Sequence, residues 1–265
     1  MKKIAILGGG NIGLSLAKGL VNAKKYKIND IVITRRNKAA LDKIKLLGFN
    51  TSINNCDAVK NAEIIVLSVL PQQLDSLLNE IKSQLTPEQL IISVVSGVSI
   101  SDIENEIKKK LTIVRAMPNT AIAINQSMTC IAANNVKVKD LELVVSIFNS
   151  VGKTAVIKEE LMTSATALCA CGIAFFLRAI RAASQGGVEI GFHADEALKM
   201  AMQTALGAAG LLIDGAHPES EIDKVTSPRG CTIAGLNTME HEGFSSAMIT
   251  GIKTASSRAE GLYKK

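Results

Sequence analysis

Residues 2–13 read KKIAILGGGNIG, and this stretch decides the fold of the chain. The apolar run that ends at Leu7 has the composition of a short strand. Glycines follow it directly, and residues 14–21 then continue with the spacing of a helix. A strand, a glycine turn and a helix in immediate succession are the context in which a G-x-G-x-x-G pattern indicates a dinucleotide site.

Each glycine of this pattern has its own mechanical reason. Gly8 lets the chain reverse, Gly10 keeps side-chain atoms away from a pyrophosphate, and Gly13 lets the helix lie close to its strand. The backbone N–H groups of Asn11 and Ile12 belong to the helix N-terminus, which favours an anion. We therefore expect a dinucleotide here. The alternative is a tight turn that binds nothing.

The end of the second predicted strand, residues 30–34, bears on the choice of cofactor. An NAD-specific site places Asp or Glu about 20 residues beyond the glycine loop, where it binds the ribose hydroxyls. This chain has Thr34, Arg35 and Arg36 at that point. A guanidinium matches a 2′-phosphate, so the sequence favours NADPH over NADH. Two exposed arginines at a strand end are the other interpretation.

Strands and helices alternate through the first part of the chain. Apolar runs typical of buried parallel strands are separated by helical segments, which predicts a doubly wound parallel sheet of the Rossmann type with its ligand at the carboxyl ends of the strands. Within this pattern Ser101 is the predicted N-cap of a helix, and Glu104 completes a capping box. The remaining expected strands are 63–70, 90–95, 111–115, 127–133 and 153–157, and the expected helices are 41–47, 73–81, 101–109 and 139–148.

The character of the chain changes after residue 158. The helical segments expected from there on are 160–184, 195–213 and 232–258, without strand runs between them. We therefore expect a dinucleotide-binding domain over residues 1–158 and a helical domain over residues 159–265.

Composition limits the classes of function. The net charge of +6 is spread over scattered lysines without interleaved aromatic residues, so we expect no nucleic-acid partner. The apolar stretch Ala165–Leu177 is shorter than the roughly 20 residues that span a bilayer, and the N-terminus does not resemble a signal peptide. The five cysteines do not form a disulfide pattern, and buried thiols are favoured over metal ligands at Cys169 and Cys171. These features predict a cytoplasmic protein without a bound metal.

One loop in the helical part could bind a substrate. Residues 226–232 open the last predicted helix, and the N–H groups of Gly230, Cys231 and Thr232 would be free donors that suit a carboxylate. The hydroxyls of Ser227 and Thr232 add further polar contacts. An ordinary helix start is the alternative. None of the three histidines has a nucleophile at the sequence spacing of a catalytic triad. A site without a strong acid suits the reduction of a protonated imine better than that of a ketone.

Four segments, in this order and spacing, resemble pyrroline-5-carboxylate reductases over essentially the whole chain. They are the glycine loop, Val69–Gln72, Arg115–Thr120 and the loop Ser227–Thr232 with Ile233–Leu236 after it. The resemblance implies a Rossmann domain and a helical dimerisation domain. It also implies the NAD(P)H-dependent reduction of 1-pyrroline-5-carboxylate to L-proline, the last step of proline biosynthesis. The homodimers of this family interlock through their helical domains and often assemble as five dimers.

The resemblance also assigns residues by position. Thr232 would hydrogen-bond the ring nitrogen, and Ser227 with the amides of Gly230 and Cys231 would hold the substrate carboxylate. The NADPH site would be lined by Thr34, Asn55, Ser68, Val69 and Leu70, with Val94 and Ser96 near the nicotinamide half.

The chain departs from the family at three places. Arg229 stands where the family usually has Gly, Leu70 where it has Lys, and Cys169–Ala174 where it has a Ser-Gly-Ser-Gly-Pro-Ala stretch. These departures leave two alternatives open. One is an enzyme on the same scaffold that reduces another cyclic imine or oxidises a β-hydroxy acid, although 169–177 contains no lysine that could act as the base for the second reaction. The other is an NADPH-binding sensor without activity.

Overall fold

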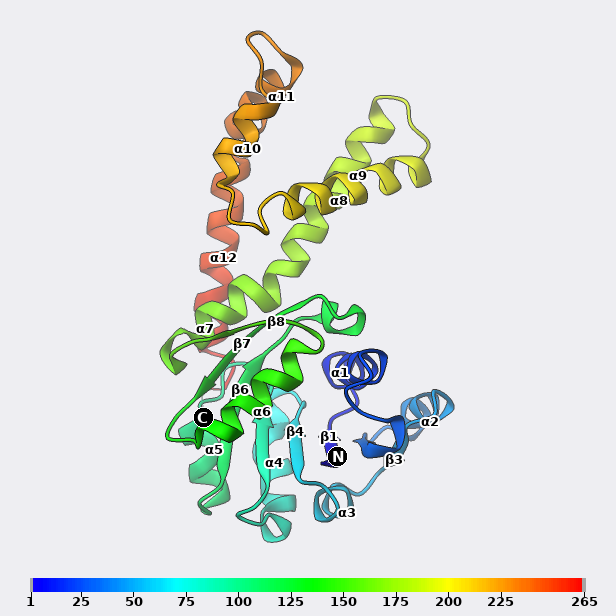
Figure 1. Cartoon of the computed structure of the whole chain (residues 1–265), viewed down its shortest axis with the longest axis vertical. Coiled ribbons are helices and arrows are strands. Elements are labelled where there is room, and N and C mark those ends of the chain that lie inside the picture. The colour runs from blue at the N-terminus through cyan, green and yellow to red at the C-terminus, as the bar shows by residue number, and fades with distance from the viewer. Residues whose placement is uncertain (1, 264–265) are drawn as a thin grey trace. The chain divides into compact units, whose positions relative to one another are not determined.

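The structure, a computed structural model, describes residues 2–263. The chain forms two compact units, which Figure 1 draws together. The first unit contains the residues up to Cys171 together with those from Thr254 onward, and the second unit contains Gly172–Lys253. The domain boundary after residue 158 that the sequence indicates stays a prediction.

The first unit contains a single sheet of eight strands. Their order across the sheet is β3-β2-β1-β4-β5-β6-β7-β8. The chain therefore places β2 and β3 on one side of β1 and then places β4 and the later strands on its other side. Such a reversal of strand order opens a crevice at the carboxyl ends of the two central strands. The strands are β1 Ile4–Leu7, β2 Ile31–Thr34, β3 Asn50–Ser52, β4 Ile64–Leu67, β5 Leu90–Ser93, β6 Thr112–Met117, β7 Ser127–Ala133 and β8 Gly152–Val156.

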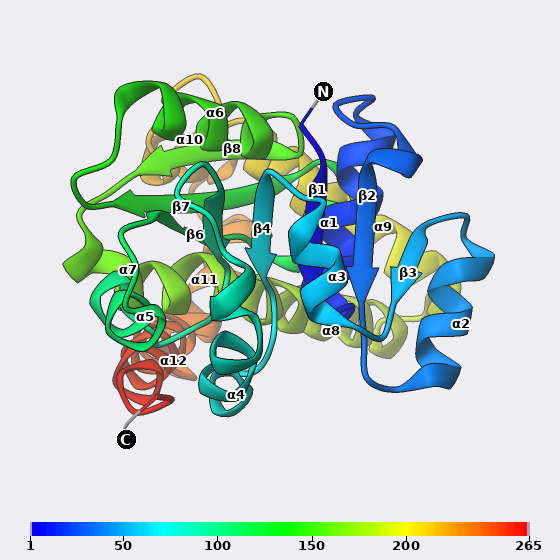
Figure 2. The same ribbon diagram turned by 90° about the horizontal axis from the view of Figure 1, so that it is seen from below.

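Helices cover both faces of this sheet, as Figure 2 shows from below. Every residue of β1, β4 and β5 is buried, which explains their unbroken apolar sequences. One core lies between the sheet and α1, α2 and α6, and a second lies between the opposite face and α3, α4 and α5. The helices are α1 Asn11–Asn22, α2 Lys38–Leu46, α3 Asn55–Lys60, α4 Pro71–Ile81, α5 Ile100–Ile107 and α6 Val138–Asn149.

This architecture confirms the Rossmann-type fold that the sequence predicts, and it adds two features. β7 runs antiparallel to β6, with Met117 opposite Cys130, while β8 runs parallel to β7. β3 pairs with β2 at the sheet edge through Asn50–Ser52. The sequence pattern gave no strand there because these residues are polar and an edge strand needs no apolar run.

The predicted capping box of α5 is wrong by two residues. The helix begins at Ile100, so Ser99 is the N-cap and its side chain accepts a hydrogen bond from the Asp102 N–H at 3.0 Å. Asp102 in turn accepts from the Ser99 N–H at 2.9 Å. Two overlapping serine patterns fit the sequence, and the burial of Ile100 and Ile103 selects the earlier one.

The second unit consists of helices. The expected helix 232–258 is two helices, because Gly243 adopts a φ of +82° between them, a conformation that favours glycine. The helix Pro218–Val225, labelled α10, was not predicted. After the sheet, the first unit also contains a 3₁₀ turn Glu159–Leu161, α7 Met162–Ala165 and a π-helical segment Thr166–Cys171. The second unit contains α8 Gly172–Glu189, α9 Ala194–Gly210, α10 Pro218–Val225 and α11 Cys231–His241. The last helix, α12 Phe244–Glu260, spans the unit boundary at Thr254.

Within the described residues one helical stretch, Glu159–Glu189, is long and apolar enough to cross a membrane by length and composition alone. Only 28% of its most apolar window is buried within the chain. Many of its apolar side chains, such as Phe176 and Leu177, are therefore exposed in an isolated subunit.

Candidate functional site

The glycine loop joins β1 to α1 as the sequence predicts. Gly8 has a φ of +115°, and a Cβ built there would lie 2.1 Å from the Ser68 carbonyl oxygen. A Cβ at Gly13 would lie 2.2 Å from the Gly8 carbonyl oxygen. A Cβ at Gly10 would meet no atom within 4 Å. The fold therefore requires glycine at two of these positions, while at Gly10 it leaves open space beside the backbone.

The start of α1 offers unpaired donors to that space. Gly10 is the N-cap, and no side chain accepts a hydrogen bond from the N–H groups of this helix start. The N–H of Leu14 is the first to bond within the helix, to the Gly10 carbonyl oxygen at 3.0 Å. The N–H groups of Asn11, Ile12 and Gly13 therefore have no partner among the described residues, which is the arrangement that binds phosphate at a helix N-terminus.

A cavity of about 640 Å³ lies over this loop, at the carboxyl ends of the strands. This volume is in the range of ligand pockets. Except for Gly13, which packs beneath the loop, every cofactor residue predicted from the sequence lines it: Gly8, Gly10, Asn11, Ile12, Thr34, Arg35, Arg36, Asn55, Ser68, Val69, Leu70, Val94 and Ser96.

Sequence reasoning missed one wall of the cavity. That wall is the face of α4 formed by Gln73, Ser76, Leu77 and Glu80. Pro71 in the first turn of α4 and the helical spacing of these residues indicate that they share one helix face, but not that this face turns toward the cavity.

A chain of hydrogen bonds fixes the polar side chains of this cavity. The buried Thr34 hydroxyl donates to Asn55 Oδ1 at 2.6 Å, and Asn55 Nδ2 donates to Glu80 Oε2 at 3.0 Å. Arg35 Nη1 donates to the Gly9 carbonyl oxygen at 2.7 Å, so its guanidinium lies against the glycine loop. Arg36 is exposed and has no hydrogen bond or ion pair among the described residues. It is the cation available to an anionic group in the cavity.

The run Met117–Thr120, which begins at the last residue of β6, contacts residues after β5 and at the start of β7. The Ser96 hydroxyl contacts Met117 Sδ at 3.8 Å. Asn119 donates from its backbone to the Ser127 hydroxyl at 3.1 Å and from Nδ2 to the Cys169 carbonyl oxygen at 3.1 Å. Its Oδ1 accepts from the Ala121 N–H at 3.0 Å. The backbone N–H, the Nδ2 and the Oδ1 of Asn119 are therefore each hydrogen-bonded to the protein itself.

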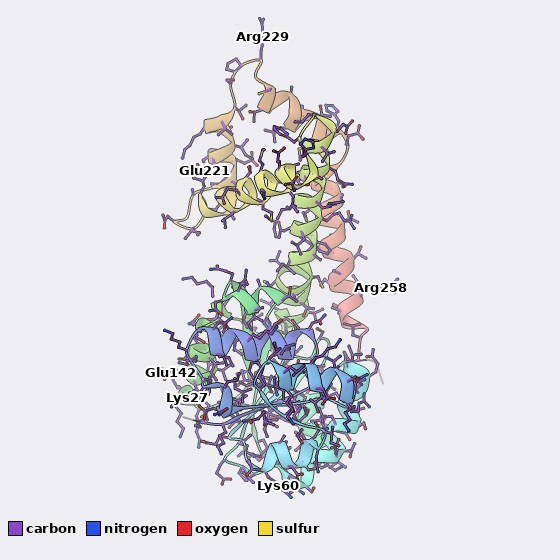
Figure 3. All side chains as sticks on the ribbon, turned by 90° about the vertical axis from the view of Figure 1, so that its right-hand side faces the viewer. Lys27, Lys60, Glu142, Glu221, Arg229 and Arg258 are labelled. Atoms are coloured by element: carbon purple, nitrogen blue, oxygen red, sulfur yellow. The ribbon has the colours of Figure 1, made fainter. Side chains whose placement is uncertain are left out.

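The predicted substrate loop is part of the second unit and opens α11. Gly230 is the N-cap, and its N–H donates to the Ser227 carbonyl oxygen at 2.9 Å to close a turn. Arg229 has a φ of +57°, and its side chain points away from the loop in Figure 3. The N–H groups of Cys231 and Thr232 have no partner among the described residues, nor does the Thr232 hydroxyl. These groups are free to bind an anion, whereas the Gly230 N–H is engaged in the turn.

The histidines do not join either site. His193 and His217 are N-caps of α9 and α10, and His217 Nδ1 accepts from the Glu219 N–H at 3.3 Å. His241 Nδ1 lies 2.7 Å from the Asn237 carbonyl oxygen in the last turn of α11. Among residues 2–263 no group of three or more His, Cys, Asp or Glu side chains could hold a metal ion.

Two segments of the sequence match known protein families. Residues 3–97 match "NADP oxidoreductase coenzyme F420-dependent", and residues 159–262 match "Pyrroline-5-carboxylate reductase dimerisation". These two segments contain the glycine loop and the loop 226–232, respectively.

Two curated proteins from Dictyostelium discoideum are similar to nearly the whole chain. Pyrroline-5-carboxylate reductase 1 is 54% identical over 98% of this chain, and the chain spans 50% of that protein's length. Pyrroline-5-carboxylate reductase 2 is 49% identical over 95% of this chain and 90% of its own length.

A solved structure shares the fold over the same extent. The pyrroline carboxylate reductase of Plasmodium falciparum, crystallised with NADP bound, is 28% identical and covers 99% of this chain and 98% of its own. Its TM-score is 0.92.

Proposed function

The chain belongs to the pyrroline-5-carboxylate reductase family of NAD(P)H-dependent oxidoreductases, and from this premise we propose that it reduces 1-pyrroline-5-carboxylate to L-proline. The observation that carries the proposal is that each unit contains an anion site. One is the cavity over the glycine loop, and the other is the open start of α11. A dinucleotide phosphate suits the first site, and a small carboxylate suits the second.

The residues of the first unit fit NADPH. The space beside Gly10 admits a pyrophosphate, and the N–H groups of Asn11 and Ile12 would bind it. Arg36 would bind the 2′-phosphate, while the hydrogen bonds to Thr34 and Glu80 hold Asn55 in position beside the ribose. Val94 and Ser96 would border the nicotinamide. When bound, NADPH supplies a hydride from C4 of that ring.

The loop of the second unit would hold the substrate. The N–H groups of Cys231 and Thr232, with the Ser227 hydroxyl, would bind the carboxylate, and the Gly230 turn keeps these donors in place. The Thr232 hydroxyl would accept a hydrogen bond from the protonated ring nitrogen and so orient the imine carbon. Because the nitrogen already carries its proton, no side chain has to act as an acid, which agrees with histidines that all lie at helix ends.

The dimerisation domain makes this chain a homo-oligomer. We propose that the basic assembly is a homodimer in the cytoplasm and that five dimers form a decamer. The support is the exposed apolar surface of α8 and α9, which a second subunit would cover. In this interpretation the exposed apolar face of α8 packs against protein and not lipid, so a membrane is not a partner. The scattered lysines likewise give no basis for a nucleic-acid partner.

The fall in NADPH absorbance on addition of pyrroline-5-carboxylate tests the activity. Parallel assays use NADH, pyrroline-2-carboxylate and piperideine carboxylates. We expect turnover of pyrroline-5-carboxylate above that of the other imines. Turnover of another imine alone would contradict the assigned substrate, and NADPH binding without any turnover would favour a sensor.

Thr232→Ala tests the catalytic assignment. We expect kcat to fall by about 10²-fold, in the range of a lost positioning contact, with the Kd for NADPH unchanged. Thr238→Ala is the matched control, because within residues 2–263 the Thr238 hydroxyl donates a hydrogen bond only to the Ala234 carbonyl oxygen on the same helix. Equal losses in kcat and in NADPH affinity would contradict the role of Thr232.

A further inference from the structure

Two cysteines that are 39 residues apart in the sequence meet inside the first unit. Cys130 lies in β7 and Cys169 lies in the π-helical segment, with their Sγ atoms 3.8 Å apart. Both thiols are free. They belong to a small apolar cluster with Met117, Ala132 and Met162. The other three cysteines, Cys56, Cys171 and Cys231, are also free.

The two sulfur atoms are in contact, and one of them can move. A disulfide has an S–S length of about 2.05 Å, so the Sγ atoms must approach by roughly 1.8 Å. Cys130 is fixed because it is paired with Met117 on one side and Ala155 on the other. Cys169 lies in a π-helical segment outside the sheet, so no strand pairing holds its backbone. A side-chain rotation with a small shift of this segment would close the gap.

The two thiols differ in reactivity. Cys130 is buried, whereas Cys169 is partly accessible to solvent. The hydrogen bond between them lowers the pKa of Cys169 to about 7, and the same bond together with burial raises the pKa of Cys130. The thiolate is the nucleophile in oxidation, so Cys169 is the residue that an oxidant reaches first.

We propose that Cys130 and Cys169 form a dithiol that hydrogen peroxide oxidises to an intramolecular disulfide. The Cys169 thiolate attacks one peroxide oxygen, giving a sulfenic acid and releasing hydroxide. The Cys130 thiol then attacks the Cys169 sulfur, the S–O bond breaks, and water leaves with the thiol proton. The peroxide takes up the two electrons that the pair of thiols loses.

The bond would tie the π-helical segment to β7 beside the cofactor cavity. Asn119 already donates to the Cys169 carbonyl oxygen, and Met117, the strand neighbour of Cys130, contacts the cavity residue Ser96. The disulfide closes a loop that contains α6 and β8. Such a closure reduces the freedom of the unfolded chain, so the oxidised protein should unfold at a higher temperature.

The test treats the whole native protein with hydrogen peroxide, alkylates the remaining thiols and maps peptides by mass spectrometry. We expect a peptide pair joined through Cys130 and Cys169, the loss of two alkylatable thiols, and reversal by dithiothreitol. Cys171→Ser is the matched control and should still form the bond. In Cys130→Ser the reaction should stop at a sulfenic acid on Cys169, which dimedone traps.

Retention of all five thiols in the wild-type protein would overturn the proposal, as would a bond from Cys169 to Cys171 or between subunits. Cys130 lies in the core, so its variant could lose the fold. Cys169→Ser covers that case, because it removes the partly accessible partner and should abolish both the cross-link and the rise in the unfolding temperature.

Discussion

The glycines of the loop 8–13 differ in what each one contributes, although the sequence pattern treats them alike. A Cβ at Gly8 or at Gly13 would lie only 2.1 or 2.2 Å from a backbone oxygen, so the fold admits no side chain at either position. Gly10 has no such contact, and its φ of −80° is open to every residue. We therefore propose that a bound ligand, and not the fold, requires glycine at this position.

Gly10→Ala should therefore separate binding from stability. The methyl group would occupy the space assigned to the pyrophosphate, and we expect the Kd for NADPH to rise at least about tenfold. Alanine is a poorer N-cap than glycine, so the unfolding temperature should fall only slightly, by about 1–3 °C. Gly13→Ala is the control and should destabilise the protein by about 2 kcal/mol or more, because its Cβ meets backbone atoms. A Gly10→Ala protein that binds NADPH normally would contradict the site.

Arg36→Ala should change the preference between cofactors. Arg36 has no partner among the described residues, so its loss leaves the fold unchanged but removes a charge-assisted bond of about 1.5–3 kcal/mol to a 2′-phosphate. We expect NADPH to bind more weakly by about one to two orders of magnitude and NADH to bind as before. Fluorescence titration with both cofactors measures this.

Arg35→Ala is the comparison for that experiment. Its guanidinium bonds the Gly9 carbonyl oxygen, so both cofactors should suffer together. If Arg36→Ala weakened NADH as much as NADPH, the 2′-phosphate assignment would be wrong.

At the scale of elements, Glu159 connects parts of the first unit that are distant in sequence. Its carboxylate accepts from Arg115 Nη1 in β6 at 3.2 Å, from the Ile100 N–H at the start of α5 at 2.7 Å, and from Asn134 Nδ2 after β7. Burial lowers the pKa of Arg115, and the bond to Glu159 counteracts that effect. One carboxylate thus caps a helix and neutralises a buried cation.

Glu159→Gln should destabilise the first unit. It leaves the Arg115 charge buried without a counter-ion, which costs about 3–5 kcal/mol in fully buried pairs. Since the Glu159 side chain is 18% exposed, we expect about 2–3 kcal/mol in urea unfolding. Glu160→Gln is the matched control, because the next carboxylate is exposed and has no ion pair among the described residues. A loss below about 0.5 kcal/mol for Glu159→Gln would show that the pair does not stabilise the fold.

How far the sequence predicts these elements depends on burial. The strands β1, β4 and β5 are apolar throughout because both faces are covered, so their sequences identify them. β3 could not be recognised, because Asn50–Ser52 becomes a strand only through its pairing with β2. The capping residue of α5 was misplaced because Ser99 and Ser101 offer the same local chemistry, and only tertiary packing of Ile100 separates them.

The candidate site follows the same rule. The glycine loop and the strand ends were predicted because the fold itself brings carboxyl ends together. The wall made by α4, with Glu80 as the partner of Asn55, depends on which face of a helix turns toward the cavity. The sequence alone does not give that orientation.

At the scale of the whole molecule, the second unit does not bury its own apolar surface. α8 and α9 pack together, yet Phe176 is 63% and Leu206 is 66% exposed. These residues border an apolar depression of about 690 Å³ formed by the two helices. We propose that another subunit covers this patch, because it lies on a dimerisation domain.

Leu206→Asp should therefore weaken the assembly. A carboxylate buried at a subunit interface without a partner is strongly unfavourable, so we expect a shift toward monomer in light scattering at micromolar concentration. Leu46→Asp is the control, because Leu46 on α2 in the first unit is 87% exposed and should tolerate the change. An unchanged mass for Leu206→Asp would place the interface elsewhere.

The most direct test of the proposed reaction follows the hydride. Two samples of NADPH, each deuterated at one of the two C4 positions, are incubated with the protein and pyrroline-5-carboxylate, and the product is analysed by mass spectrometry. We predict L-proline that carries one deuterium at C5 from only one of the two samples, because a fixed cofactor presents a single face to the imine. Proline without deuterium from either sample, or no proline at all, would contradict the proposed reduction.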